Sequence, residues 1–212
     1  MRSKVGIFCI VLGVLLLIGA PVLAFFNMRQ DATAGDAAAA ALSQLVDQIR
    51  ENAEKEPTDP EAEGFGNWGL QVPVELLTEE DKKMTEVEID GYAYIGYLTI
   101  PTLGLELPVM SSWSYPQLRI APCRYAGSLR GEDLVLMAHN YNNHFGRISQ
   151  LNIGDRISFT NMDGVTITYK VVAKDILDPT AVEEMTEGTY DLTLFTCTYG
   201  GGSRVTVYCN KA

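Results

Sequence analysis

Residues 191–209 read DLTLFTCTYGGGSRVTVYC and contain two short runs of strand-forming residues separated by a glycine-rich segment. The first run, 191–197, ends at Cys197, and the second run, 204–209, begins at Arg204. Consecutive glycines permit a tight reversal because glycine adopts backbone conformations that other residues avoid. We therefore expect an antiparallel strand pair that brings Cys197 and Arg204 close together.

The same periodicity of two recurs upstream of this hairpin. Gly, Pro, Asn and Asp separate the further β-rich runs, which are residues 92–100, 134–139, 156–160 and 165–176. Asp163-Gly164 predicts a hairpin between the last two runs. Residues 114–120 and 146–151 are expected to form single helical turns. Short strands separated by turn residues predict an all-β domain, either an antiparallel barrel or a sandwich.

The amino-terminal segment has a different character. Residues 5–28 carry no charge and are long enough, at about 1.5 Å rise per residue, to cross a membrane as a helix. Arg2 and Lys4 precede this segment, so the positive-inside rule predicts a cytoplasmic N-terminus and an extracytoplasmic domain. A cleaved signal peptide is the alternative, but its apolar region usually spans only roughly 7–15 residues. We expect an uncleaved, single-pass anchor in the cell membrane.

Residues 29–64 separate the anchor from the β-rich domain. Apolar residues at helical spacing within 37–52 predict a short amphipathic helix that acts as a stalk or packs on the domain. Residues 51–64 combine acidic side chains with Pro57 and Pro60, which is typical of a solvated linker. The expected organisation is therefore an anchor at 1–28, a helical stalk and acidic linker at 29–64, and a folded domain at 65–212.

The net charge of −11 argues against nucleic acid as a partner. Residues 1–28 contain no acidic residue, so the acidic excess belongs to the rest of the chain. An acidic surface repels phosphate backbones.

A small set of residues could carry chemistry. His139 and His144 are the only histidines, and His139 directly follows the apolar residues 134–138. Cys, His and Arg together supply a nucleophile, a general acid–base and an oxyanion donor, as acyl transfer requires. A buried cysteine, a surface histidine and a solvated arginine are the structural alternatives. No further ligand cluster accompanies the two histidines, so we expect no metal and a polar loop position for His144.

Several stretches in this order resemble the sortases, the membrane-anchored cysteine transpeptidases of Gram-positive bacteria. The segment TLFTC at 193–197, followed by Arg204, looks like the TLxTC…R signature of that family. Further similar stretches are YIGYLTIP at 94–101, LELPV at 105–109, GEDLVLMAHN at 131–140 and residues 145–155.

The resemblance implies an eight-stranded sortase-type β-barrel with short helices behind an N-terminal transmembrane helix. It implies that Cys197 attacks the Thr carbonyl of an LPxTG-like sorting signal on a secreted protein and forms a thioester. His139 would protonate the leaving amine, and Arg204 would hold the substrate backbone or the oxyanion. Thr196 and Thr198 are candidate substrate-binding residues through their backbone. No organic cofactor is implied.

The acceptor implied by the resemblance is an amine on a cell-wall precursor or on a pilin lysine, with hydrolysis when no amine is present. Pilin-polymerising members often have a second membrane span and an Asp-Pro-aromatic lid, whereas this chain has Asp59-Pro60-Glu61 and no second apolar run. We therefore favour anchoring of surface proteins. A pilin polymerase, a cysteine protease that uses water, and a non-enzymatic binding barrel are the alternatives.

The remaining candidates have structural interpretations. A disulfide between Cys123 and Cys209 is possible, but packing is the preferred role for both thiols. Trp113, Tyr115 and Tyr141 are expected to pack rather than to contact substrate.

Overall fold

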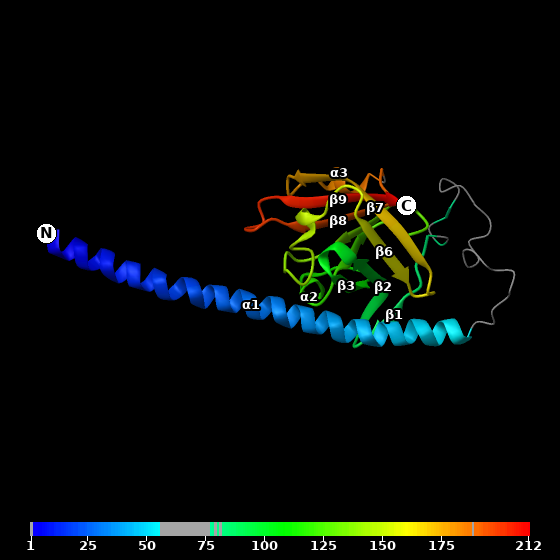
Figure 1. Cartoon of the computed structure of the whole chain (residues 1–212), viewed down its shortest axis with the longest axis horizontal. Helices are drawn as coiled ribbons and strands as arrows, with labels where there is room; N and C mark the ends of the chain where they lie inside the picture. The colour runs from blue at the N-terminus through cyan, green and yellow to red at the C-terminus, as the bar shows by residue number, and fades with distance from the viewer. Residues whose placement is uncertain (1, 56–76, 79, 81, 188) are drawn as a thin grey trace. The chain divides into compact units, whose positions relative to one another are not determined.

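The computed structural model describes residues 2–55, 77–78, 80, 82–187 and 189–212 (Figure 1). The chain divides into two compact units, residues 1–33 and 34–212. In chain order the elements are α1 (Arg2–Lys55), β1 (Val87–Ile89), β2 (Tyr92–Ile100), η2 (Pro101–Leu103), β3 (Leu105–Met110), α2 (Tyr115–Leu118), β4 (Cys123–Ala126), β5 (Leu134–Met137), η3 (Ile148–Gln150), β6 (Arg156–Asn161), β7 (Thr166–Leu177), α3 (Val182–Thr186), β8 (Leu192–Cys197) and β9 (Arg204–Lys211).

Eight strands, β2 to β9, close into a barrel. The strand order is β2-β3-β4-β5-β8-β9-β7-β6, and a β2–β6 pairing joins its two ends. Strand β1 adds to β2 alone, through a turn at Asp90 and Gly91 in which both residues have positive φ. The prediction of an all-β barrel with short helices is confirmed.

Most strand pairs are antiparallel, as expected, but β3–β4 and β5–β8 are parallel. The β5–β8 pair is the more extensive, with Leu134 opposite Leu192 and Met137 opposite Phe195. A hairpin cannot make such a pair, because parallel strands need a long crossover connection. Here the connection contains the β6–β7 hairpin, whose turn uses Gly164 at φ 77° as the Asp-Gly pattern predicts.

The strands β5, β8 and β9 have one face toward the barrel interior and one face outward. Leu192 and Leu194 of β8 lie in the main core with Val207 and Cys209 of β9. Phe195, the next residue along β8, belongs instead to a separate cluster on the outer face. Since side chains alternate along a strand, Cys197 shares the outward face with Phe195, and Thr196 points inward.

Helix α1 is continuous from Arg2 to Lys55, so the predicted anchor and the predicted 37–52 helix are parts of one element. Its segment Gly6–Asn52 contains a stretch that is apolar and long enough to cross a membrane, the one such helix among the described residues. Within the second unit, Ala38 packs into the main core, and Ala41 and Leu45 pack into a neighbouring cluster. The packing alternative for this helix is therefore the observed one. Residues 56–64 of the predicted linker, with Asp59-Pro60-Glu61, lie outside the described residues.

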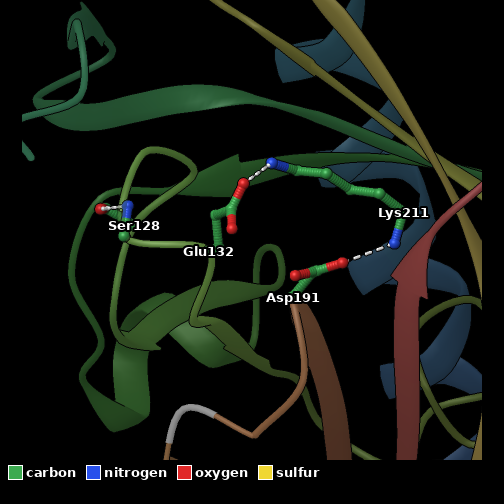
Figure 2. Close-up of polar contacts among 5 residues, drawn as sticks. Ser128, Glu132, Asp191 and Lys211 are labelled. Carbon is green, nitrogen blue, oxygen red and sulfur yellow. Dashed lines mark hydrogen bonds and ion pairs between the residues drawn. The ribbon is translucent and has the colours of Figure 1, made fainter. Parts of the chain in front are cut away.

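The last strand is tied to residues that lie just before β5 and β8, as Figure 2 shows for Glu132, Asp191 and Lys211. The Lys211 backbone N–H donates to Asp191 Oδ2 at 2.6 Å, and the Lys211 ammonium forms an ion pair with Glu132. We call this the Lys211 end of the β5–β8–β9 sheet and the opposite one the Cys197 end.

Candidate functional site

The register of three strands places Cys197, Arg204 and His139 at one end of the sheet. Cys197 is paired directly with Arg204 across β8 and β9. Met137 of β5 pairs with Phe195 of β8. His139 lies two residues beyond Met137, and Cys197 lies two residues beyond Phe195. Because β5 and β8 are parallel, their carboxyl ends meet at the same edge. The sequence predicted the Cys197–Arg204 pair; the parallel pairing adds His139.

All three residues belong to outward-facing positions beside an apolar cluster on the outer face of the sheet. We call this cluster the outer patch: it consists of buried Val135, Met185 and Phe195, with half-buried Tyr125, Ala126, Met137 and Leu177 packed around them. His139 has the same strand parity as Val135, and Cys197 has the same parity as Phe195. The site is thus three polar side chains at the edge of an apolar cluster.

Aromatic rings extend the outer patch toward solvent. The Tyr125 ring meets Phe195 edge-on at 5.2 Å between centroids, and Trp113 lies 6.0 Å from Tyr125. Tyr115 meets Trp113 edge-on at 6.1 Å and is 72% exposed. Trp113 and Tyr115 pack on one another, as expected, and they also prolong the outer patch.

The His139 imidazole stacks on the ring of Tyr141, with 4.8 Å between centroids and 29° between planes. Burial lowers the pKa of His139, and the nearby positive charge of Arg119 lowers it further. The site therefore favours the neutral imidazole, the form that can accept a proton. Tyr141 was expected only to pack; its spacing of two residues from His139 was the available signal for this contact.

His144, expected at a polar loop position, is completely buried. Its ring lies 5.5 Å from that of Tyr141. No group of three or more His, Cys, Asp or Glu side chains is arranged to hold a metal ion within the part of the chain that the structure describes.

The Arg204 guanidinium lies against the loop that joins β8 to β9. Its Nη1 donates to the carbonyl oxygens of Gly201 and Ser203, both at 3.1 Å. Arg204 also contributes, after two hydrogen bonds from Thr180, to lowering the pKa of Asp178. The cation is therefore held by carbonyl oxygens on one side and has an acidic residue nearby.

The two threonines that flank Cys197 bond to backbone rather than to each other. Thr196 Oγ1 donates to the Ala138 carbonyl oxygen at 2.8 Å, and its side chain is buried. The Thr198 hydroxyl accepts from the Ser203 N–H at 3.0 Å and donates to the Ser203 carbonyl oxygen at 3.3 Å. The Thr198 backbone N–H donates to the same Ser203 oxygen at 2.9 Å, so its use as an oxyanion donor would require that bond to open. The sequence analysis considered only the backbone of these threonines.

The other cysteines differ from Cys197 in exposure. Cys123 and Cys209 are free and buried, in two different core clusters, and burial raises the pKa of each thiol to about 12. Their predicted packing role is confirmed. Cys197 is half-buried and Cys9 is exposed.

Comparisons with known proteins agree on one family. Residues 98–212, more than half of the chain, match the description "Sortase domain". The chain is similar to the crystal structure of sortase C1 from Streptococcus suis, at 30% identity and a TM-score of 0.51, over 56% of this chain and 73% of that one. No curated protein matches the chain.

Two further structures share the fold. Sortase C1 from Streptococcus agalactiae is 19% identical with a TM-score of 0.53, over 84% of this chain and 98% of that one. A sortase D5 transpeptidase from Clostridium perfringens is 19% identical with a TM-score of 0.51, over 65% of this chain and 90% of that one. The barrel, the domain match and the S. suis relative lead to one conclusion: the chain belongs to the sortase family.

Proposed function

We propose that this sortase is a cysteine transpeptidase that cleaves an LPxTG-like sorting signal of secreted proteins and joins them to a cell-wall amine. The observation that carries the proposal is the meeting of Cys197, His139 and Arg204 at one end of the sheet, at the edge of the outer patch. A thiol, a largely neutral imidazole and a fixed cation supply the three functions that acyl transfer through a thioester needs.

In the first half-reaction the Cys197 sulfur attacks the Thr carbonyl carbon of the sorting signal. His139 takes the proton of the Cys197 thiol, and it gives this proton to the leaving amine as the carbon–nitrogen bond breaks. Arg204 is placed to stabilise negative charge on the carbonyl oxygen, because it begins the strand paired with the nucleophile. The products are a thioester on Cys197 and a free amine.

In the second half-reaction an incoming amine attacks the thioester. His139 takes the proton that this amine loses, a new amide forms, and the Cys197 sulfur leaves and receives that proton from His139. Water in place of the amine gives a carboxylic acid, so hydrolysis is the side reaction. The acceptor is an amine of a cell-wall precursor; a pilin lysine is the alternative.

The outer patch fits the apolar residues of such a signal. The more accessible rings of Tyr125, Trp113 and Tyr115 continue outward from buried Phe195, which lies two residues before Cys197. Burying the Leu and Pro side chains of a peptide on these rings would supply binding energy of about 25 cal/mol per Å² of apolar area.

We also propose that helix α1 anchors the enzyme in the cell membrane with the N-terminus inside and the catalytic domain outside.

The test uses the full chain in detergent micelles, incubated with an LPxTG peptide, with or without triglycine or a peptide carrying one lysine. Intact mass spectrometry should show a peptide adduct on the wild type, which is resolved to an amide product by the preferred amine. Cys197→Ala should form no adduct, whereas the matched control Cys9→Ala, which removes the other non-buried thiol, should behave like the wild type.

Each other outcome changes the proposal. Adduct formation by Cys197→Ala would remove the catalytic assignment. Hydrolysis alone with every amine would favour a cysteine protease, and transfer to lysine alone would favour a pilin polymerase.

A further inference from the structure

The hydroxyls of the two threonines that flank Cys197 bond to residues that directly precede His139 and Arg204. Thr196 bonds to Ala138, the residue immediately before His139. Thr198 bonds to Ser203, the residue immediately before Arg204. Each hydroxyl therefore connects a residue adjacent to Cys197 with a residue adjacent to His139 or Arg204.

We infer that Thr196 and Thr198 are positioning residues, whose hydroxyls set the positions of His139 and Arg204 relative to Cys197. The inference rests on the proposed function, in which these three residues act together. Neither hydroxyl needs to touch the substrate for this role.

The Thr196 bond acts where the β5–β8 ladder ends. The last ladder contact is the Ala138 N–H to the Phe195 carbonyl oxygen at 3.3 Å, a long bond. The buried Thr196 hydroxyl adds a 2.8 Å bond to the Ala138 carbonyl oxygen, one step further along the chain toward His139. This bond holds the Ala138 carbonyl group, which is directly joined to the His139 nitrogen, against β8.

The Thr198 bonds close the loop that carries Arg204. The hydroxyl accepts from and donates to the same residue, Ser203, while the Gly201 N–H donates to the Thr198 carbonyl oxygen at 2.9 Å. The carbonyl oxygens of Gly201 and Ser203 are the two acceptors of the Arg204 guanidinium. Loss of the hydroxyl would leave the Thr198 N–H bond to the Ser203 carbonyl oxygen but would free the Ser203 N–H, which should loosen the segment that carries both acceptors of the arginine.

Valine is the informative substitution because it keeps the branched shape of threonine and its strand preference while removing the hydroxyl. Serine keeps the hydroxyl and should restore function. Thr206 offers a matched control: it lies on β9 opposite Phe195, is fully buried, and its hydroxyl has no hydrogen-bond partner among the described residues. Thr206→Val thus removes a buried threonine hydroxyl from the same sheet without breaking a bond.

The first measurement does not depend on a substrate. The full-length variants are alkylated with iodoacetamide across a range of pH, and peptide mass spectrometry follows the rate at Cys197. Because the thiolate is the form that reacts and nearby charged or proton-accepting groups influence its formation, a displaced His139 or Arg204 should change the pH profile of this rate. We expect Thr196→Val and Thr198→Val to shift the profile, and Thr196→Ser, Thr198→Ser and Thr206→Val to match the wild type.

The second measurement is transfer of the LPxTG peptide to the preferred amine. Each valine variant should lower kcat about 5- to 10-fold, the effect of one lost hydrogen bond, with little change in KM. Thermal unfolding monitored by circular dichroism identifies any variant that fails to fold, in which case the serine variant and the pH profile decide.

Two results would overturn the inference. Wild-type pH profiles and wild-type kcat in both valine variants would show that the hydroxyls do not position the site. Equal losses in Thr206→Val would show that the effect comes from core disruption alone. By contrast, a wild type without Cys197-dependent transfer but with shifted alkylation profiles in the valine variants would count against the proposed function and leave the positioning role intact.

Discussion

At the Cys197 end of the β5–β8–β9 sheet, hydroxyls bond to the backbone, one of them within the buried interior; at the Lys211 end, exposed charged groups meet. The Lys211 and Glu132 side chains remain 39% and 45% exposed, so water and salt screen their attraction. The Thr196 hydroxyl at the other end is buried, where a lost partner costs more. The same three strands are therefore joined by a buried side-chain hydrogen bond at the Cys197 end and by a weaker, solvent-screened ion pair at the Lys211 end.

The sharpest test of this contrast removes one cation from each end of β9. Arg204→Gln should lower kcat/KM for the LPxTG peptide about 100-fold or more, because it removes the charge that we propose stabilises the developing oxyanion. Lys211→Gln, at the other end of the same strand, should leave kcat/KM within about twofold of the wild type. Comparable losses in both variants would mean that the two ends do not differ in function.

A smaller effect is expected from Tyr141→Leu. The substitution removes the ring that stacks on His139 but keeps an apolar side chain. An aromatic pair contributes about 0.5–1.5 kcal/mol, so kcat should fall several-fold while the melting temperature changes little. Steady-state kinetics and thermal unfolding of the full chain check this. A large fall in stability with unchanged kcat per folded molecule would assign Tyr141 to the core alone.

The charge of Arg119 should affect the site through the pKa of His139. Burial and Arg119 both lower this pKa below 6.5, so the neutral imidazole persists to lower pH in the wild type. Arg119→Gln removes one of the two causes, so the pKa of His139 should rise and the acidic limb of the rate profile should move to higher pH. NMR titration of the two histidines in a Cys197→Ala background measures the pKa without interference from the thiol. An unchanged His139 titration would contradict the expected influence of Arg119.

The smallest effect is expected at the Lys211 end itself. Glu132→Gln removes the ion pair and should reduce stability by less than about 1 kcal/mol. For a chain of this size that corresponds to a melting temperature lower by less than about 4 °C. The difference from the wild type should shrink further in high salt, and activity should not change. A loss of activity here would remove the contrast between the two ends.

The parts of the fold with strong local patterns were predictable. The six long β-rich runs, the Asp163-Gly164 hairpin and the two helical turns appear at or near the expected residues. β1, β4 and α3 were not anticipated, because their short sequences show too little alternation to recognise, and the β3 segment was noted only through the family resemblance. The Asp90-Gly91 pair was a turn signal for β1 that went unused. The continuity of α1 was also missed, since the change from an apolar to an alanine-rich composition does not by itself end a helix.

The sequence predicted the Cys197–Arg204 pair of the candidate site more directly than the place of His139. Local sequence places Cys197 beside Arg204, because one short hairpin joins them. His139 could be associated with them only through the family resemblance, since nothing local indicates that β5 pairs with β8. The contacts of Tyr141 and of the Thr196 hydroxyl depend on that pairing, which is why residue type alone did not reveal them.

The parallel β5–β8 pairing also governs when the chain can become reactive during folding. Cys197 and Arg204 can meet as soon as a local hairpin forms, but Leu134 must find Leu192 across an intervening segment that itself contains the β6–β7 hairpin. Contacts between residues so distant in sequence form slowly, because the loop they close costs entropy before any contact repays it. His139 therefore reaches the Cys197 end of the sheet only when the barrel closes, so a partly folded chain would carry the proposed nucleophile without the proposed proton donor.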